Sequence, residues 1–347
     1  IFKNNENIPA YMFMAVVVAL FIGLTVSAEE IIRDRKILKR ESFLHLSRSS
    51  YIISKIGILF FISAIQTCLF VLVGNSILEI KSMFFIHWAI LFTVSCFANL
   101  LGLNISSAFN SAVTIYILIP ILLIPQLILS GVVVKFDKLN PIIGNTTTVP
   151  AVGDVMASRW AFEAALVSQY KDNEFEKQFY LYDKTMAESD YKKIYLIPQL
   201  ETKLDFVSLN IKNPEPVVQK LVSEDLKLIR TEIRKELSDI GHHNFTRSND
   251  LVPERYDSAL QKETRVFFET LKKVYVQRYN KADQEKDKKI SSLTTTAAGE
   301  KDFEEYKSSY QNEAIAELVR NTAETNRIIE KDGELVQKIF PIYKDPD

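Results

Sequence analysis

Residues 82–134 have the sequence SMFFIHWAILFTVSCFANLLGLNISSAFNSAVTIYILIPILLIPQLILSGVVV, and none of them is Asp, Glu, Lys or Arg. Two shorter stretches without these residues lie at 10–28 and 56–78. The hydrocarbon core of a bilayer is ~30 Å thick, so a helix crosses it with ~20 apolar residues. Backbone groups in lipid must be hydrogen-bonded within helices or closed barrels. These stretches therefore predict four helical crossings, two of them in the longest stretch.

The average composition conceals this pattern. The chain has 24% charged residues, a formal net charge of −1 and a mean hydropathy of +0.03, all typical of a soluble protein. The average combines an apolar half, up to about residue 134, with a polar half long enough for a domain of roughly 200 residues. We therefore expect an all-α integral membrane protein, a polytopic helical bundle at 1–134 that carries a large, mainly helical domain.

Turn-forming residues interrupt the longest apolar stretch at 101–112. They predict a turn between membrane helices at 83–103 and 112–134. Two prolines, Pro120 and Pro125, lie inside the second helix. They predict a kink rather than a break, because neighbouring groups or water can satisfy the freed carbonyls. The residues that mark the turn are Gly102, Asn104, Ser106, Ser107, Asn110 and Ser111.

The connection at 29–55 predicts the orientation in the membrane. It contains more basic than acidic residues, and short basic loops face the cytoplasm. The connection at 74–81 is then outside, the turn at 101–112 inside, and the large polar domain on the external face. The basic residues of this connection are Arg33, Arg35, Lys36, Lys39, Arg40, Arg48 and Lys55.

The polar half shows helical periodicity after a less regular segment at 135–213. Apolar residues at helical spacing predict helices at 215–240 and 254–289. A Ser/Thr/Ala/Gly-rich loop is expected at 291–299, followed by a third helix at 301–339. The acidic and histidine residues around 239–250, which include His242 and His243, are expected to form a solvated loop rather than a metal site.

The uncharged membrane helices argue against coupled transport by ion relay, because ion-driven carriers generally place charged residues or histidine within the bilayer. His87 is near the start of a helix, where an interfacial position is expected. Gln66, Asn99 and Gln126 could line a transport path or join helices by hydrogen bonds. Cys68 and Cys96 lie inside predicted membrane helices and are expected to behave as small apolar residues.

The chain has no Gly-x-x-x-x-Gly-Lys-Ser/Thr motif, no Gly-x-Ser-x-Gly motif and no His-Glu-x-x-His motif. We therefore expect no catalytic site in this chain. The apolar patch at 339–343, just before the last residue, and the first residue, which is not Met, predict that the chain is cut from a longer protein.

Two charged pairs occur in mirrored order in the 29–55 connection. Asp34 and Arg35 are followed, after four residues, by Arg40 and Glu41. This pattern resembles the cytoplasmic connecting segment of ATP-binding cassette (ABC) exporters with type-2 permeases, the White/ABCG group. That segment has Glu-Arg, four residues and Arg-Glu, so Asp34 stands where the family usually has Glu.

A second motif follows the apolar half. The sequence SRWAFEA at 158–164 precedes Asn173, Glu174 and Phe175. It resembles the external re-entrant region of the same family, with Ser-x-x-Tyr/Trp-x-Phe-Glu-Ala and a later Glu-Phe. The resemblance covers about 8–177 and implies a re-entrant region at 135–177. The remaining 178–347 would be a helical external insert, larger than the loop usual in that family.

The resemblance implies a function. The four visible membrane helices would belong to a set of six per permease half, in a dimer of halves in the plasma or bacterial inner membrane. Residues 29–55 would form the coupling segment, in which Asp34, Arg35, Arg40 and Glu41 pair with a nucleotide-binding domain, fused or separate. That domain would bind ATP and Mg²⁺ and drive export, with an apolar or amphipathic cargo suiting the uncharged helices. Membrane lipid is an expected partner and nucleic acid is not.

Two alternatives remain open on the sequence. The basic residues of 29–55 could simply lie among lipid headgroups, where each contributes ~1 kcal/mol near an anionic surface. The chain could also be a membrane-anchored receptor or scaffold whose external helices bind a partner. The large insert favours that function, whereas the ordered pair of exporter-like motifs favours the permease.

Overall fold

The computed structural model describes residues 2–41, 47–109, 111–134, 149–240, 245–324 and 327–344. These residues form two compact units. Unit 1 comprises 1–177 and 304–316, and unit 2 comprises 178–303 and 317–347. Both units are mainly helical, which confirms the predicted helical fold class.

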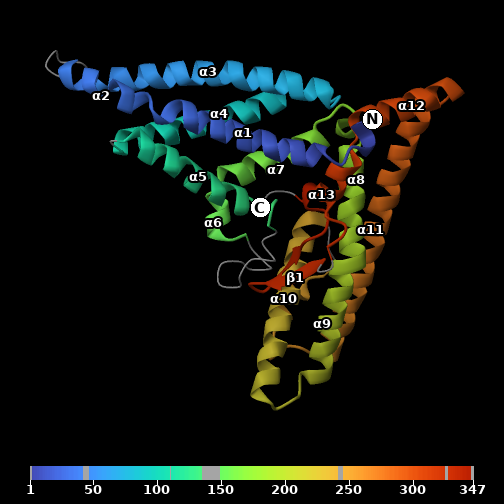
Figure 1. Cartoon of the computed structure of the whole chain (residues 1–347). Coiled ribbons are helices and arrows are strands. Elements are labelled where there is room, and N and C mark those ends of the chain that lie inside the picture. Colours follow the sequence, from blue (N-terminus) through green and yellow to red (C-terminus); the bar gives the residue numbers. More distant parts are fainter. Residues whose placement is uncertain are drawn as a thin grey trace. The chain divides into compact units, whose positions relative to one another are not determined.

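Unit 1 contains the apolar helices (Figure 1). Both α1 and α3 pack along α4, and α7 packs against α1 and α4. The core at these contacts is built from buried aliphatic residues such as Val16, Leu20 and Leu91. The elements are η1 Phe2–Asn4, α1 Ile8–Ala28, α2 Glu30–Glu41, α3 Arg48–Ile77, α4 Phe84–Ala108, α5 Ala112–Ile128, α6 Ala151–Asp154 and α7 Ala157–Lys171.

Small residues allow α1 and α4 to approach closely. A Cβ added at Gly23 would lie 2.7 Å from the Ala98 Cβ, and one added at Gly102 would lie 2.0 Å from the Ser27 Oγ. Two helix backbones can come this near only where side chains are missing or short. The glycines therefore set the separation of the two central helices.

The predicted turn at 101–112 is wrong in its extent, because α4 continues through it to Ala108. Gly102 is needed at the contact with α1, and it does not end the helix. The Asn104 and Ser107 side chains donate to the carbonyls of Leu100 and Asn104, 2.9 and 2.8 Å away, so these polar groups are satisfied within the helix. The described break between α4 and α5 is therefore much shorter than predicted.

Three helical stretches in the described residues are long and apolar enough to cross a membrane. They are Ile8–Arg40, which comprises α1 and most of α2, Arg48–Ile77 and Phe84–Ala108. The fourth predicted crossing is the shorter apolar helix α5, which ends at Ile128 rather than at residue 134. Its 17 residues extend ~25 Å, close to the lower limit for a crossing. Pro120 and Pro125 lie inside it without ending it, as predicted.

Unit 2 has a core of buried aliphatic and aromatic residues on α9, α10 and α11, including Leu200, Leu226 and Phe268. Helix α8 begins two residues before the unit boundary and continues through a π-helical turn into α9. The elements that follow α7 are α8 Glu176–Tyr191, η4 Lys192–Leu196, α9 Ile197–Asn210, α10 Pro216–Ile240, η5 Arg247–Asp250, α11 Ser258–Leu293, α12 Ala297–Tyr310, α13 Glu313–Arg320, β1 Ile328–Lys331, β2 Glu334–Gln337 and η6 Pro341–Tyr343.

Two predictions for the polar half are wrong. The segment at 135–213 was expected to be less regular. From residue 151 to 210 it consists of helices joined by short loops. The third helix at 301–339 is instead two helices followed by an antiparallel hairpin, in which Ile328 pairs with Gln337. Asp332 and Gly333 form the hairpin turn with φ of 54° and 80°, a conformation that Asp-Gly favours and that ends any helix.

Candidate coupling site

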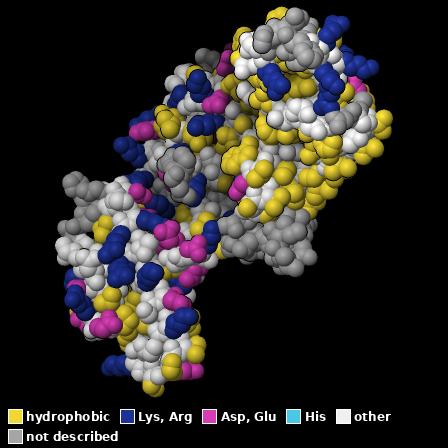
Figure 2. All heavy atoms as spheres, turned by 90° about the vertical axis from the view of Figure 1, so that its left-hand side faces the viewer, with side chains coloured by type: hydrophobic (Ala, Val, Ile, Leu, Met, Phe, Trp, Pro, Cys, Tyr) yellow, Lys and Arg dark blue, Asp and Glu magenta, His cyan; other side chains and the backbone are white. Residues whose placement is uncertain are grey.

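Helix α2 follows α1 after Glu29 and is amphipathic. Ile31 and Ile32 on one face are half-buried, whereas Arg33, Lys36 and Arg40 are exposed on the other. Figure 2 shows Lys and Arg side chains around the end of unit 1 that carries this helix, beside a broad hydrophobic surface on the membrane helices. The exposed face of α2 is therefore basic.

An ion-pair cluster attaches α2 to the first turns of α3. The Lys55 Nζ lies 2.6 Å from the Glu30 Oε2 and 2.7 Å from the Asp34 Oδ2. The Tyr51 hydroxyl donates to the same Asp34 oxygen over 3.0 Å. Hydrogen bonds from an ammonium and a hydroxyl group favour the charged form of a carboxylate. Asp34 is thus an ionised anchor for α3.

A second set of hydrogen bonds attaches α2 to the carboxyl end of α4. The Ser106 hydroxyl, which is fully buried, accepts from the backbone N–H groups of Ile31 and Ile32 at 3.0 and 3.2 Å. Arg35 donates to the carbonyls of Ser107 and Phe109 at 3.2 and 3.1 Å. Helix ends leave such groups without partners inside their own helix. The polar groups of α2 and those at the carboxyl end of α4 therefore satisfy each other's hydrogen bonds.

The four residues of the predicted coupling pattern fall into two groups. Asp34 and Arg35 are bound within unit 1, to α3 and α4. Arg40 is exposed near the end of α2, and the side chain of Glu41 lies outside the described residues. The charge pattern did not indicate Glu30 or the role of Lys55. A signal was present, because Glu30 and Asp34 lie four residues apart on α2, as Tyr51 and Lys55 do on α3, and this spacing puts each pair on one helix face.

The second motif lies on α7, which packs into the same bundle. The Ser158 hydroxyl donates to the Gln126 carbonyl over 2.6 Å, and its N–H donates to the Gln126 Oε1 over 3.2 Å. The rings of Phe162 and Phe13 meet edge to face at 5.5 Å. Helix α7 is 15 residues long, or ~22 Å, too short to cross a bilayer.

A buried asparagine joins α7 to α8. The Asn173 side chain donates to the Gln169 and Tyr170 carbonyls at 2.8 Å and accepts from the N–H groups of Phe175 and Glu176 at 3.0 and 2.8 Å. It thus satisfies the end of one helix and the start of the next. This contact is part of the motif at 158–175 that predicted a re-entrant region.

Residues 1–170 match the model of the ABC-2 type transporter family. This part of the chain is an ABC-2 type permease domain. It is the transmembrane part of an ABC-type transporter, and permeases of this family typically pair with an ATP-binding component. The resemblance seen in the sequence is confirmed at the level of this family, and the White/ABCG branch stays a prediction. No curated protein and no solved structure matches the chain.

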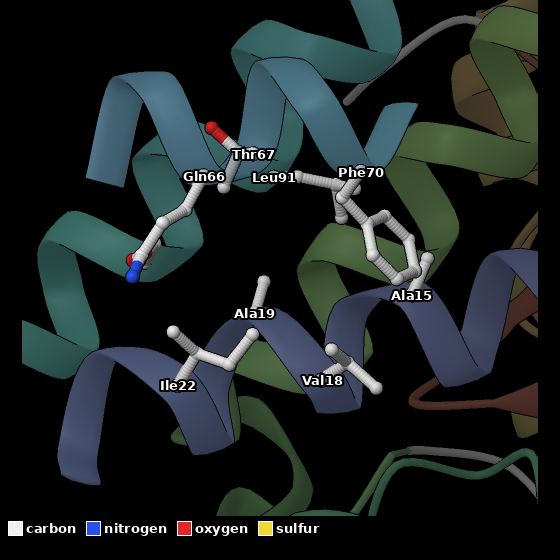
Figure 3. A pocket seen from close by; sticks show the side chains of 9 residues that line it. Ala15, Val18, Ala19, Ile22, Gln66, Thr67, Phe70 and Leu91 are labelled. Atoms are coloured by element: carbon white, nitrogen blue, oxygen red, sulfur yellow. The ribbon is translucent and has the colours of Figure 1, made fainter. Parts of the chain in front are cut away.

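Polar residues in the helices of the permease domain have distinct surroundings. The Asn99 Nδ2 donates to the Ser63 Oγ over 2.7 Å, and the Ser95 Oγ donates to the same oxygen over 2.9 Å. Gln126 accepts the two hydrogen bonds from Ser158. Gln66 extends into a small pocket between α1, α3 and α4 (Figure 3). Asn99 and Gln126 thus join helices, whereas Gln66 lines a cavity.

His87 lies in the first turn of α4, near the helix start as predicted, and its side chain is buried between helices. Its position at the membrane interface stays a prediction. The described residues contain no group of three His, Cys, Asp or Glu that could hold a metal ion. His242 and His243 lie outside those residues, so the solvated loop expected there stays a prediction. Cys68 and Cys96 are free thiols on α3 and α4.

Proposed function

We propose that the permease domain exports an apolar or amphipathic cargo, driven by ATP hydrolysis in a nucleotide-binding domain that is fused to the chain or separate. That domain would bind ATP and Mg²⁺. Two permease halves would form the transport unit, multi-pass in the plasma or bacterial inner membrane. Residues 178–347 would lie on the external face and 29–55 on the cytoplasmic face.

One observation carries this proposal: α2 is fixed to α3 and to α4 at the same time. Lys55 holds its acidic residues, and Ser106 and the carbonyls after it hold its first turns. A movement of α2 would therefore be passed to two membrane helices through these ion pairs and hydrogen bonds, as coupling by rigid-body movement requires.

The exposed basic face is available for the partner. Lys36 and Arg40 are exposed, and Arg33 is exposed while pairing with Glu30 at 2.6 Å. Such residues form charge-assisted hydrogen bonds with carboxylates of another domain. Binding to lipid headgroups explains the charge of this face, but it does not require that α2 be fixed to two helices.

The test is ATP hydrolysis by the full-length protein, with any co-purifying ATPase, in lipid. Wild type is compared with the double variant Arg40→Ala, Glu41→Ala over a panel of amphipathic compounds. We expect basal hydrolysis in both, with stimulation by cargo lost in the variant. Absence of any fused or co-purifying ATPase would overturn the proposal and favour the receptor or scaffold. Stimulation of the variant equal to that of wild type would overturn the coupling role of α2.

A further inference from the structure

Residues 304–316, the return segment, are far along the chain from the membrane helices but belong to unit 1. The segment comprises the end of α12 and the start of α13. It contacts several segments at the end of the bundle where α1 begins, which is opposite the end that carries α2. These contacts are therefore separate from the proposed coupling at α2.

Asn312 fixes the return segment to the residues that precede α1. Its side chain is only 4% exposed, and its Nδ2 donates to the carbonyls of Phe2 and Asn5 at 2.8 and 3.0 Å. Its Oδ1 accepts from the N–H of Ile315 at 3.0 Å, so the same side chain caps α13. One residue therefore both starts α13 and holds the chain that leads into α1.

Two further hydrogen bonds join the return segment to other helix ends. The Lys81 Nζ donates to the Ser309 Oγ over 3.2 Å, and Lys81 lies in the turn between α3 and α4. The Gln311 Nε2 donates to the Glu176 Oε1 over 2.7 Å, and Glu176 is the first residue of α8. The return segment thus contacts the start of α1, the α3–α4 turn and the junction of α7 and α8.

The turn between α3 and α4 is strained. Glu79 and Ser82 have φ of 57° and 61°, a left-handed conformation that is unfavourable for residues other than glycine. The Ser82 hydroxyl donates to the Glu174 Oε1 over 2.9 Å, and the neighbouring Lys81 binds the return segment. Strained backbone persists only where surrounding contacts hold it, and it is common in segments that switch conformation. Loss of these contacts would therefore let the turn relax.

Some of the contacts are of a kind that breaks reversibly. Lys3 and Glu313 form an ion pair of 3.5 Å between side chains that are 32% and 63% exposed, so solvent screens it. The bond between Lys81 and Ser309 is also exposed, and water replaces an exposed hydrogen bond at little net cost.

We propose that the return segment is a strap that holds the start of α1, the α3–α4 turn and the α7–α8 junction in one arrangement, and that export requires it to detach from residues 2–5. The detachment rests on the proposed function, whereas the holding does not. The experiment therefore measures the two separately.

Carbodiimide crosslinking of the full-length protein in lipid tests the holding. The reagent joins an amine to a carboxylate in contact with it, so an amide between Lys3 and Glu313, mapped by mass spectrometry, reports the attached strap. Asn312→Ser keeps an oxygen that caps α13, but its single hydroxyl cannot donate to two carbonyls. We expect it to lower the yield of this amide roughly fivefold. Asn210→Ser is the matched control, because the Asn210 amide donates within its own helix. An unchanged yield in Asn312→Ser would overturn the strap.

A reversible lock tests the detachment. Lys3→Cys and Glu313→Cys are combined in full-length protein in which the free thiols Cys68 and Cys96 are replaced by Ala. A flexible reagent with a reducible disulfide joins the two new thiols and locks the strap, and a reductant releases it. We expect the locked protein in lipid to keep basal ATP hydrolysis and to lose its stimulation by amphipathic compounds, with recovery after reduction.

The matched control lock uses Lys235→Cys with Glu334→Cys, at an ion pair of 2.7 Å within unit 2, and is expected to have no effect. Full stimulation of the locked strap would overturn the detachment, and so would an equal loss of stimulation in the locked control. Absence of any fused or co-purifying ATPase would overturn the proposed function and the detachment with it, whereas the carbodiimide result still decides the strap.

Discussion

The Lys55 ammonium lies 2.7 Å from the Asp34 carboxylate and 2.6 Å from that of Glu30, so one cation joins two acidic residues of α2 to α3. The side chains of Lys55 and Asp34 are only about one-fifth exposed, which limits screening of the pair by solvent. The contact lies at the end of the permease domain where the basic face of α2 is exposed. The ion-pair cluster therefore holds α2 and α3 together as one rigid unit.

Replacing Lys55 with Met is therefore expected to free α2 from α3 while leaving the membrane helices folded. A partly exposed ion pair contributes ~1 kcal/mol, too little for its loss to unfold the bundle. We predict a normal midpoint of thermal unfolding in detergent and basal ATP hydrolysis near that of wild type, with weakened stimulation by cargo.

Two controls belong to that measurement. Lys55→Arg keeps the positive charge and is expected to retain most of the stimulation. Arg48→Met removes an exposed cation from the first turn of the same helix and is expected to have no effect. If Lys55→Met shows full stimulation, α2 does not act through α3.

The α1–α4 contact predicts a large difference between two Gly→Ala variants. At Gly102 the new Cβ would lie 2.0 Å from the Ser27 Oγ and 3.0 Å from the Leu24 carbonyl oxygen, so α1 has to move away. Overpacking of this kind costs ~1–3 kcal/mol. At Gly57 the new Cβ meets nothing within 4 Å, and Gly57→Ala is expected to be neutral or slightly stabilising. Unfolding of both variants in mixed micelles checks this, and equal stabilities would refute the close approach.

Asn99 is expected to contribute modestly to helix association. Asn99→Leu removes its hydrogen bond to Ser63, and such bonds in membrane helices contribute ~0.6 kcal/mol on average. Ser95 still donates to Ser63 in that variant, so no buried hydroxyl loses all its partners. Asn104→Leu is the control, as an exposed residue on the same helix. A loss in Asn99→Leu no greater than in the control would show that the Asn99 bond contributes nothing.

The tyrosines of unit 2 predict a loss of stability at alkaline pH. Burial raises the pKa of Tyr191 and Tyr275, and raises that of Tyr256 to about 12. In the unfolded chain these groups lose their protons near pH ~10. Above that pH the unfolded state binds fewer protons than the folded state, so the free energy of unfolding falls as pH rises. The contribution of these tyrosines is complete below pH ~10.

Hydrogen exchange of α9–α11 peptides, followed with tyrosinate absorbance across this range, measures that effect. Tyr275 donates to the buried Glu236 carboxylate and accepts from Lys192 over 3.1 Å. Tyr275→Phe is expected to cost ~1 kcal/mol at neutral pH and to reduce the alkaline loss. Tyr182→Phe, on a half-buried residue, is the control. A free energy of unfolding that does not fall above pH ~10 would contradict the prediction.

The sequence predicted the apolar helices well, because helix length in a bilayer is set by hydrocarbon thickness and charge is excluded from it. It failed where tertiary contacts override local preference. Gly102 and Ser106 are residue types that favour turns, yet both lie inside α4. Gly102 leaves room for the close approach of α1, and Ser106 accepts hydrogen bonds from N–H groups of α2. The hairpin was missed although Asp332-Gly333 is a turn signal, because the charged residues around it match a helical pattern equally well.

The coupling segment was recognised as a charge pattern, but the pattern did not show which charged residues bind within the permease domain and which are exposed. Asp34 and Arg35 are adjacent, so they point in different directions, one to Lys55 and the other to the end of α4. The Tyr51 hydroxyl that binds Asp34 is 17 residues away in the sequence, and the Phe109 carbonyl that binds Arg35 is 74 residues away. Periodicity within α2 puts Glu30 and Asp34 on one helix face, but it does not identify the helix that this face contacts.

The proposed coupling depends above all on contact between the exposed basic face of α2 and a nucleotide-binding domain. The most direct measurement places a photo-crosslinking amino acid at Lys36 or Arg40 in the full-length protein in lipid, with Leu209, an exposed residue of unit 2, as the control position. We predict a protein crosslink to an ATP-binding component or domain from both α2 positions, changed in yield by ATP and absent at the control. Crosslinks to lipid alone from both α2 positions would contradict it.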